Sequence, residues 1–125
     1  MSVKFYRCNI CGNVVIKTVD SGINIVCCGE DMEELIPQTA DNGMEKHVPV
    51  VTSIGENLYQ VKVGSTEHPM LSAHYIQFIY VETEHGGQIA YLLPNDKPAA
   101  TFYTKEKIIA VYEYCNVHGL WKAQL

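Results

Sequence analysis

Four of the five cysteines of this chain have the spacing of a four-thiolate metal site. Cys8 and Cys11 form a Cys-x-x-Cys pair, and the adjacent residues Cys27 and Cys28 follow after fifteen intervening residues. Pairs at this spacing bring four thiolates to one ion, and the backbone N–H groups between them point at the sulfurs. The pattern therefore predicts a metal site near the N-terminus.

Gly12 and Gly29 directly follow the two cysteine pairs, and glycine allows the tight backbone turns of such a site. The alternative interpretation is a disulfide framework in a small secreted domain. Residues 1–7 contain no basic stretch followed by an apolar one, so we expect no export. A metal site is the preferred interpretation.

The fifth cysteine belongs to a second candidate site, which histidines complete. Cys115 lies three residues before His118, so that a thiolate and an imidazole can reach one ion. Prolines follow His47 and His68 closely and restrain the backbone there to extended geometry. Taken singly, each histidine is more often an ordinary polar residue than a ligand. Together with a lone thiolate, the histidines favour a site made of His47, His68, His74, Cys115 and His118.

The number of donors in this second site indicates which metal it takes. Four imidazoles and one thiolate are one donor more than structural zinc uses and one fewer than an octahedron needs. Iron with an open sixth position fits best, and small oxygen species are its natural substrates. His85 is left out, because an exposed hairpin turn at Glu84-His85-Gly86-Gly87 explains it.

Composition limits the partners of the protein. The chain has 125 residues and a formal net charge of -5, which argues against nucleic acid or an anionic membrane as the main partner. No apolar run approaches the roughly 20 residues of a membrane span. We expect a soluble, cytoplasmic protein.

The sequence divides near residue 37. Residues 1–36 hold the four cysteines and the short extended runs 3–6 and 13–17, and they are too few to form a stable core without a metal. Residues 37–43 are polar and turn-forming, which predicts a linker. Residues 44–125 form the second predicted domain.

The second domain is predicted to be an antiparallel β-sandwich of immunoglobulin-like build. Its candidate strands are 48–54, 59–63, 76–80, 88–93, 99–103 and 107–114, separated by turns rich in Gly, Pro and Asn. Alternation places Ile76, Phe78 and Tyr80 on one face. No helix of ordinary length is evident, so the fold class is mainly β.

The combined motifs resemble the desulfoferrodoxin family, the two-iron class of superoxide reductases. The resemblance covers essentially the whole chain and rests on the four-cysteine pattern together with Glu45-Lys46-His47-Val48-Pro49, His68-Pro69-Met70, His74-Tyr75 and the run Cys115 to Trp121. It implies a desulforedoxin-like, rubredoxin-related first domain with one non-haem iron on the four cysteines. In the second domain it implies an active non-haem iron with four equatorial histidines and Cys115 as the axial ligand.

The family's reaction, by the same resemblance, is the one-electron reduction of superoxide to hydrogen peroxide. A rubredoxin-like protein is the usual electron donor, and a homodimer is the usual assembly. The resemblance assigns Lys46 to attracting the anion and Glu45 to the sixth position on the resting ferric ion. A charged pair on a loop is usually just solvated, but Lys46 adjoins the ligand His47 and the protein is net negative.

Two other classes of function remain open from the sequence. One is a rubredoxin-like electron carrier, in which the second domain is a metal-binding docking module. The other is a structural adaptor with zinc in both sites, which visible colour would distinguish from iron. A dismutase is the weaker alternative, since it would consume superoxide without a reductant. Trp121 and the tyrosines are explained by packing and receive no catalytic role.

Overall fold

The computed structural model describes residues 3–40, 47–64 and 68–125 as two compact units, Met1–Ile36 and Pro37–Leu125. Every regular element in these ranges is a β-strand, and every strand pair is antiparallel, so the predicted mainly β fold is confirmed. The described residues contain no helix that is long and apolar enough to cross a membrane.

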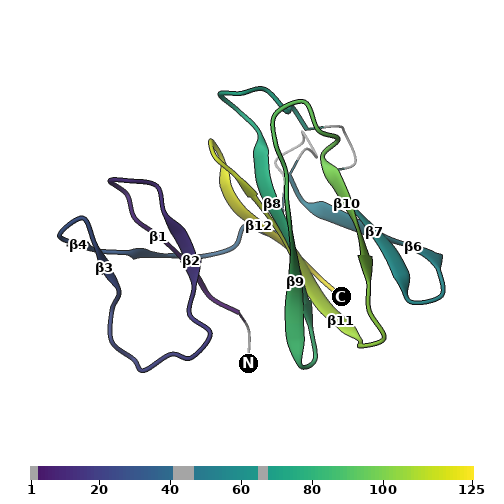
Figure 1. Ribbon diagram of the computed structural model, residues 1–125, viewed down its shortest axis with the longest axis horizontal. Helices are drawn as coiled ribbons and strands as arrows, with labels where there is room; N and C mark the ends of the chain where they lie inside the picture. Colours follow the sequence, from purple (N-terminus) through teal and green to yellow (C-terminus); the bar gives the residue numbers. More distant parts are fainter. Residues whose placement is uncertain (1–2, 41–46, 65–67) are drawn as a thin grey trace. The chain divides into compact units, whose positions relative to one another are not determined.

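The first unit has two small sheets (Figure 1). Strand β1 (Phe5–Arg7) lies between β2 (Val14–Ile16) and β5 (Glu33–Leu35), and β3 (Val26–Cys27) pairs with β4 (Glu30–Asp31). The predicted run 3–6 overlaps β1, and the predicted run 13–17 contains β2. The other three strands were not predicted, because segments of two or three residues show no alternation. The buried apolar side chains of the first unit, among its described residues, are Phe5, Cys8, Met32 and Leu35.

The second unit is built from two antiparallel sheets with one core (Figure 1). The three-stranded sheet has the order β10 (Ala99–Tyr103), β7 (Leu58–Val63), β6 (Pro49–Gly55). The four-stranded sheet has the order β12 (Gly119–Gln124), β11 (Ile108–Cys115), β8 (Ile76–Thr83), β9 (Gly86–Tyr91). Six of these strands overlap the predicted ones, and β12 was missed.

The core packs side chains of one sheet against those of the other. Val61, Val63 and Phe102 of the three-stranded sheet belong to the same buried cluster as Ile79 and Val111 of the four-stranded sheet. Burial of such side chains contributes about 1.5 to 3 kcal/mol each. This packing makes the sandwich a rigid support for the loops at its ends.

One expectation about strand β8 is wrong. Ile76 lies in the core cluster with Ile79 and Val81, whereas Phe78 does not. The pairing of β8 with β11 shifts register between Tyr114 and Cys115, so that Cys115 pairs with Ile76 instead of Gln77. A bulge of this kind adds one residue to a strand and reverses the faces of the residues beyond it. Cys115 lies on the same face of β11 as Val111, so regular alternation along β11 brings it to the core.

The polar segment predicted to be a linker includes a residue that is bound to the second unit. The Gln38 N–H donates to the Leu120 carbonyl at 3.0 Å, and the Lys122 N–H donates to the Gln38 carbonyl at 2.8 Å. Gln38 therefore extends along the start of β12, as an isolated parallel bridge with Trp121.

Candidate metal centres

The four cysteine sulfurs of the first unit all lie within 4.8 Å of one another. The Sγ atoms of Cys11 and Cys27 are 3.7 Å apart, and those of Cys27 and Cys28 are 4.0 Å apart. These separations are far longer than the roughly 2.05 Å of a disulfide bond. Four sulfurs placed tetrahedrally at about 2.3 Å from one ion would be about 3.8 Å apart. The geometry therefore fits a four-thiolate metal ion, and all five cysteines are free.

Local backbone conformation brings these sulfurs together. The Cys11 N–H donates to the Cys8 Sγ at 3.4 Å, as the Cys-x-x-Cys spacing predicts. Gly12 and Gly29 have φ values of +84° and +77°, which glycine adopts without a steric penalty. The side-chain amide of Asn13 donates to the Cys27 Sγ at 3.7 Å. Hydrogen bonds of this kind stabilise negative charge on sulfur.

Cys8 and Cys28 of the first unit have opposite pKa shifts. Backbone N–H groups of Cys11 and Ile10 lower the pKa of Cys8 to about 6. Hydrogen bonds with the sulfurs of Cys11 and Cys8 raise the pKa of Cys28 to about 12. The backbone favours one thiolate, but four adjacent negative charges repel each other. A bound cation removes this conflict, since it stabilises all four thiolates together.

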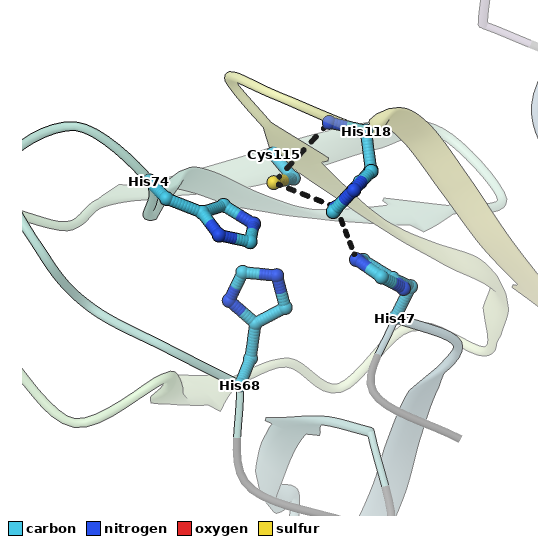
Figure 2. A group of neighbouring side chains, drawn as sticks. All are labelled: His47, His68, His74, Cys115 and His118. Atoms are coloured by element: carbon cyan, nitrogen blue, oxygen red, sulfur yellow. Dashed lines mark hydrogen bonds between the residues drawn. The ribbon is translucent and has the colours of Figure 1, made fainter. Parts of the chain in front are cut away.

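The second group of donors comes from four separate parts of the second unit. His47 lies just before β6, His68 and His74 lie between β7 and β8, Cys115 ends β11, and His118 lies in the turn before β12. One donor atom from each of these five residues lies within 4.8 Å of every other. Figure 2 shows the four imidazoles turned toward a common centre with the Cys115 sulfur beside them.

The four imidazole rings form a closed square. Proceeding through His47, His68, His74 and His118, neighbouring ring centroids are 4.8, 4.9, 4.9 and 4.7 Å apart, and neighbouring rings are inclined by 72° to 83°. The His47 Nε2 and His118 Nδ1 atoms are 3.0 Å apart. Nitrogens at the corners of a square, each about 2.1 Å from a central ion, would be about 3.0 Å from their neighbours. The rings thus fit one ion bound in their midst.

The contacts of His68 decide which of its nitrogens faces the centre. Its Nδ1 is 2.6 Å from the Pro69 carbonyl, which requires a proton on Nδ1 and leaves a lone pair on Nε2. The Nε2 atom is buried and has no hydrogen-bond partner among the described residues. Burial lowers the pKa of His68 to about 4, so the ring is neutral at ordinary pH. A buried lone pair directed at other donors is what a metal ligand provides.

Cys115 supplies the one soft donor of this group. Its side chain is fully buried, and burial raises the pKa of the thiol. The His118 N–H donates to the Cys115 Sγ at 3.4 Å and opposes that shift. Because a thiol must lose its proton to bind a metal, the buried thiolate depends on a cation and on this N–H for its stability.

The structure describes most of the residues singled out in the sequence. Within each of the two predicted donor sets, the side chains converge, and the two sets form separate groups. Glu45 and Lys46 lie outside the described residues. His85 belongs to neither group, and its Nδ1 is 3.1 Å from the Glu106 Oε2.

Two residues contact the second group in ways that the sequence did not predict. Trp121 stacks on His47, and the Gln38 amide donates to the His118 carbonyl at 2.8 Å. Trp121 lies only three residues beyond His118, and this proximity was the one signal in the sequence. Gln38 gave none.

Comparison with known proteins identifies the family. A family model described as Desulfoferrodoxin matches residues 39–124. The chain belongs to the desulfoferrodoxin family. A second model, described as Desulfoferrodoxin, N-terminal domain, matches residues 2–35 and confirms the desulforedoxin-like character predicted for the first unit.

Relatives match over nearly the whole chain. The desulfoferrodoxin of Desulfarculus baarsii is 40% identical over 123 residues, covering 98% of this chain and 96% of that protein. A desulfoferrodoxin homolog of Archaeoglobus fulgidus is 41% identical, covering 97% and 96%. The solved superoxide reductase from Treponema pallidum has a TM-score of 0.84 and 28% identity, and the match covers 98% of each chain. For this desulfoferrodoxin, the four-cysteine and His4Cys groups are consistent with two iron sites.

The first prediction concerns Cys115→Ser. We expect loss of the sulfur-to-iron charge-transfer band of the second site and a fall of about 100-fold or more in superoxide reduction, because Cys115 is the one soft donor of the group. Absorption spectra and stopped-flow kinetics on iron-loaded protein measure both. The absorption of the four-cysteine iron is the internal control. A variant that kept both band and activity would contradict the ligand assignment.

The second prediction separates the two iron sites through Cys11→Ser. Loss of one thiolate should release or disturb the first iron and unfold the first unit locally, because few side chains are buried there. Superoxide reduction should remain substantially intact when a small reductant reduces the second iron directly. Metal analysis and single-turnover kinetics test this expectation. Complete loss of activity in a variant that retains the second iron would show that the first iron is an obligatory relay.

Proposed function

We propose that this desulfoferrodoxin is a superoxide reductase that works at the His4Cys iron. One electron from the protein and two protons convert superoxide to hydrogen peroxide, with no dioxygen released. The observation that carries the proposal is the square of four imidazoles with a buried thiol beside it. These five donors are more than the four that structural zinc requires. The solved superoxide reductase that matches the full chain supports it.

The donor set explains why this site, and not the four-cysteine site, is the place of reaction. Four thiolates close a tetrahedral site and leave no position for a substrate. Five donors leave one of the six octahedral positions for a small anion. Bound iron would supply the one-electron change between its ferrous and ferric states. The Cys115 thiolate would help to hold that ion, and its charge donation would favour reduction of a small anion there.

Lys46 and Glu45 complete the proposal. Superoxide is an anion, and the protein has a net charge of -5, so the approach of substrate requires a local positive charge. Lys46 directly precedes His47, whose Nε2 belongs to the donor square. Glu45 is proposed as a carboxylate that occupies the sixth position in the ferric state and is lost on reduction, because a hard anion prefers the harder ferric ion.

The proposal also includes the partners that the family resemblance implies. A small rubredoxin-like protein would donate the electron, and the exposed Cys11 and Cys28 offer it an approach to the first iron. Free thiols arranged for metal binding suit a reducing compartment, which supports a cytoplasmic location. A homodimer is the proposed assembly, and sedimentation of the full chain tests it.

The decisive experiment mixes pulse-generated superoxide with prereduced protein. Hydrogen peroxide should form in a one-to-one ratio with oxidised second iron, and continued turnover should require a donor such as reduced rubredoxin. Oxygen release without a donor would indicate a dismutase. Reversible cycling of the first iron without consumption of superoxide would indicate an electron carrier. Each of these two results excludes the proposed activity.

The third prediction concerns Lys46→Ala. The second-order rate constant for superoxide should fall by about 10- to 100-fold, equivalent to about 1.4 to 2.8 kcal/mol, because the steering charge is lost. The remaining rate should depend less on ionic strength. Pulse radiolysis at several salt concentrations measures both, and Lys97→Ala serves as a control for net charge. An unchanged rate constant would refute the steering role.

The fourth prediction concerns Glu45→Ala. The rate constant for superoxide should hardly change, because the variant removes a displaceable carboxylate and keeps Lys46. The ferric spectrum should change, and added anions such as azide should bind more tightly to the oxidised protein. Titration of the ferric variant with azide measures this. Identical ferric spectra for the variant and the parent would contradict a carboxylate in the sixth position.

A further inference from the structure

Trp121 contacts the ring of one proposed iron ligand and the backbone of another. Its indole stacks on the His47 imidazole, with ring centroids 4.6 Å apart and planes inclined by 15°. Its Nε1–H donates to the His118 carbonyl at 3.2 Å. The side chain is buried, with 8% of its surface exposed. One side chain of β12 therefore restrains two adjacent corners of the donor square.

Gln38 donates to the same carbonyl as Trp121. Its Nε2 is 2.8 Å from the His118 carbonyl oxygen, so that oxygen accepts two hydrogen bonds and both lone pairs are used. The Gln38 backbone is itself fixed by its hydrogen bonds to Leu120 and Lys122. Two donors from distant parts of the sequence thus hold one peptide group in place.

The backbone of His118 transmits this restraint to the thiolate. The same residue that accepts these two hydrogen bonds donates its N–H to the Cys115 Sγ at 3.4 Å and presents Nδ1 to the donor square. The carbonyl, the ring and the N–H of His118 share one Cα atom, so a fixed carbonyl limits the movement of the other two groups. Trp121 and Gln38 therefore act on His47, His118 and, through the N–H, on Cys115.

We infer that Trp121 and Gln38 are positioning residues for the iron of the His4Cys site. They hold the His47 and His118 lone pairs on the ion and keep the His118 N–H on the thiolate, and so they set the affinity for iron and its reduction potential. The inference rests on the His4Cys group as the iron site of the proposed function. Trp121 and Gln38 act through the ligands that they contact, His47 and His118.

The physical basis is the strict geometry of an imidazole ligand. Its lone pair lies in the ring plane, so a tilt of the ring turns the lone pair away from the ion. A flat indole 15° from parallel opposes such a tilt of His47. Hydrogen bonds to a thiolate withdraw charge from sulfur and raise the potential of the bound iron. Outer partners of metal ligands commonly contribute about 10- to 100-fold to metal affinity.

The test compares variants that remove the two contacts separately. Trp121→Phe keeps an aromatic ring against His47 and removes the N–H donor, whereas Trp121→Leu removes both. Gln38→Leu removes the other donor to the carbonyl and keeps the backbone hydrogen bonds of residue 38. Phe102→Leu is the matched control, because Phe102 is a buried aromatic residue of the core on the other sheet and is outside the donor group.

The readouts are iron binding, the charge-transfer band and the reduction potential of the second iron, with the four-cysteine iron as internal reference. Trp121→Leu should weaken iron binding by about 10- to 100-fold in competition with a ferrous chelator. The band should move to lower energy and the potential should fall, because the thiolate loses part of its hydrogen bond. Trp121→Phe and Gln38→Leu should show smaller shifts, and their combination more than the sum, since it leaves the carbonyl with neither of these side-chain donors.

Phe102→Leu should lower the melting temperature and leave all three readouts unchanged. The inference is overturned if Trp121→Leu behaves in the same way, because Trp121 would then be a packing residue only. It is also overturned if the double variant keeps the parent band and potential. These measurements need bound iron and no catalytic activity. If the protein binds iron in this site but does not reduce superoxide, the proposed function is contradicted, and the test of Trp121 and Gln38 remains valid.

Discussion

The mutual repulsion of converging donor atoms is the constraint on which this structure depends. Five lone-pair donors lie within 4.8 Å of one another in the second unit, and none of the described residues donates a hydrogen bond to His68 Nε2. Burial keeps His68 neutral and disfavours the Cys115 thiolate. An arrangement of this kind is stable when a cation occupies the centre. The folded sandwich holds the donors in place. The free energy of iron binding offsets the unfavourable free energy of bringing these donors together.

The two units meet the same constraint in different ways. In the first unit, two pairs of nearby residues supply the sulfurs, and the four buried apolar side chains among its described residues supply little of the folding free energy. Metal and fold therefore depend on each other there. In the second unit, the core between two sheets consists of apolar side chains together with Cys115, and the segments outside the strands present the four histidines. A site on such a support can leave one coordination position open without collapse.

The sandwich controls the second site through its strands and through contacts beside them. Alternation along β11 places Cys115 in the core with Val111, where burial makes the thiol a strongly donating ligand once it is deprotonated. Beside it, the carbonyl of His118 accepts hydrogen bonds from Gln38 and Trp121. Gln38 and His118 are 80 positions apart in the sequence. The properties of the iron are thus coupled to the way the start of β12 is packed.

The sequence by itself determined the kind of fold and the first donor set, because each depends on local information. It determined the second donor set and the family through residue types and motifs spread along the chain. Cysteine spacing, alternation of apolar residues and the turns between strands are properties of short segments. The sequence did not reveal β12, whose six residues follow the last ligand without a clear alternation. Alternation also failed for Ile76, because a bulge depends on the partner strand.

Only the tertiary structure decided that His47, Gln38 and Trp121 meet, and that the four rings form a square. Such contacts join segments far apart in the chain, and their pairing is fixed by the packing of two sheets around one core. The pattern of apolar and polar residues within one segment does not predict which distant side chain will contact that segment. The chemistry of the donors is therefore readable from the sequence, whereas their orientation and their outer contacts arise from the fold.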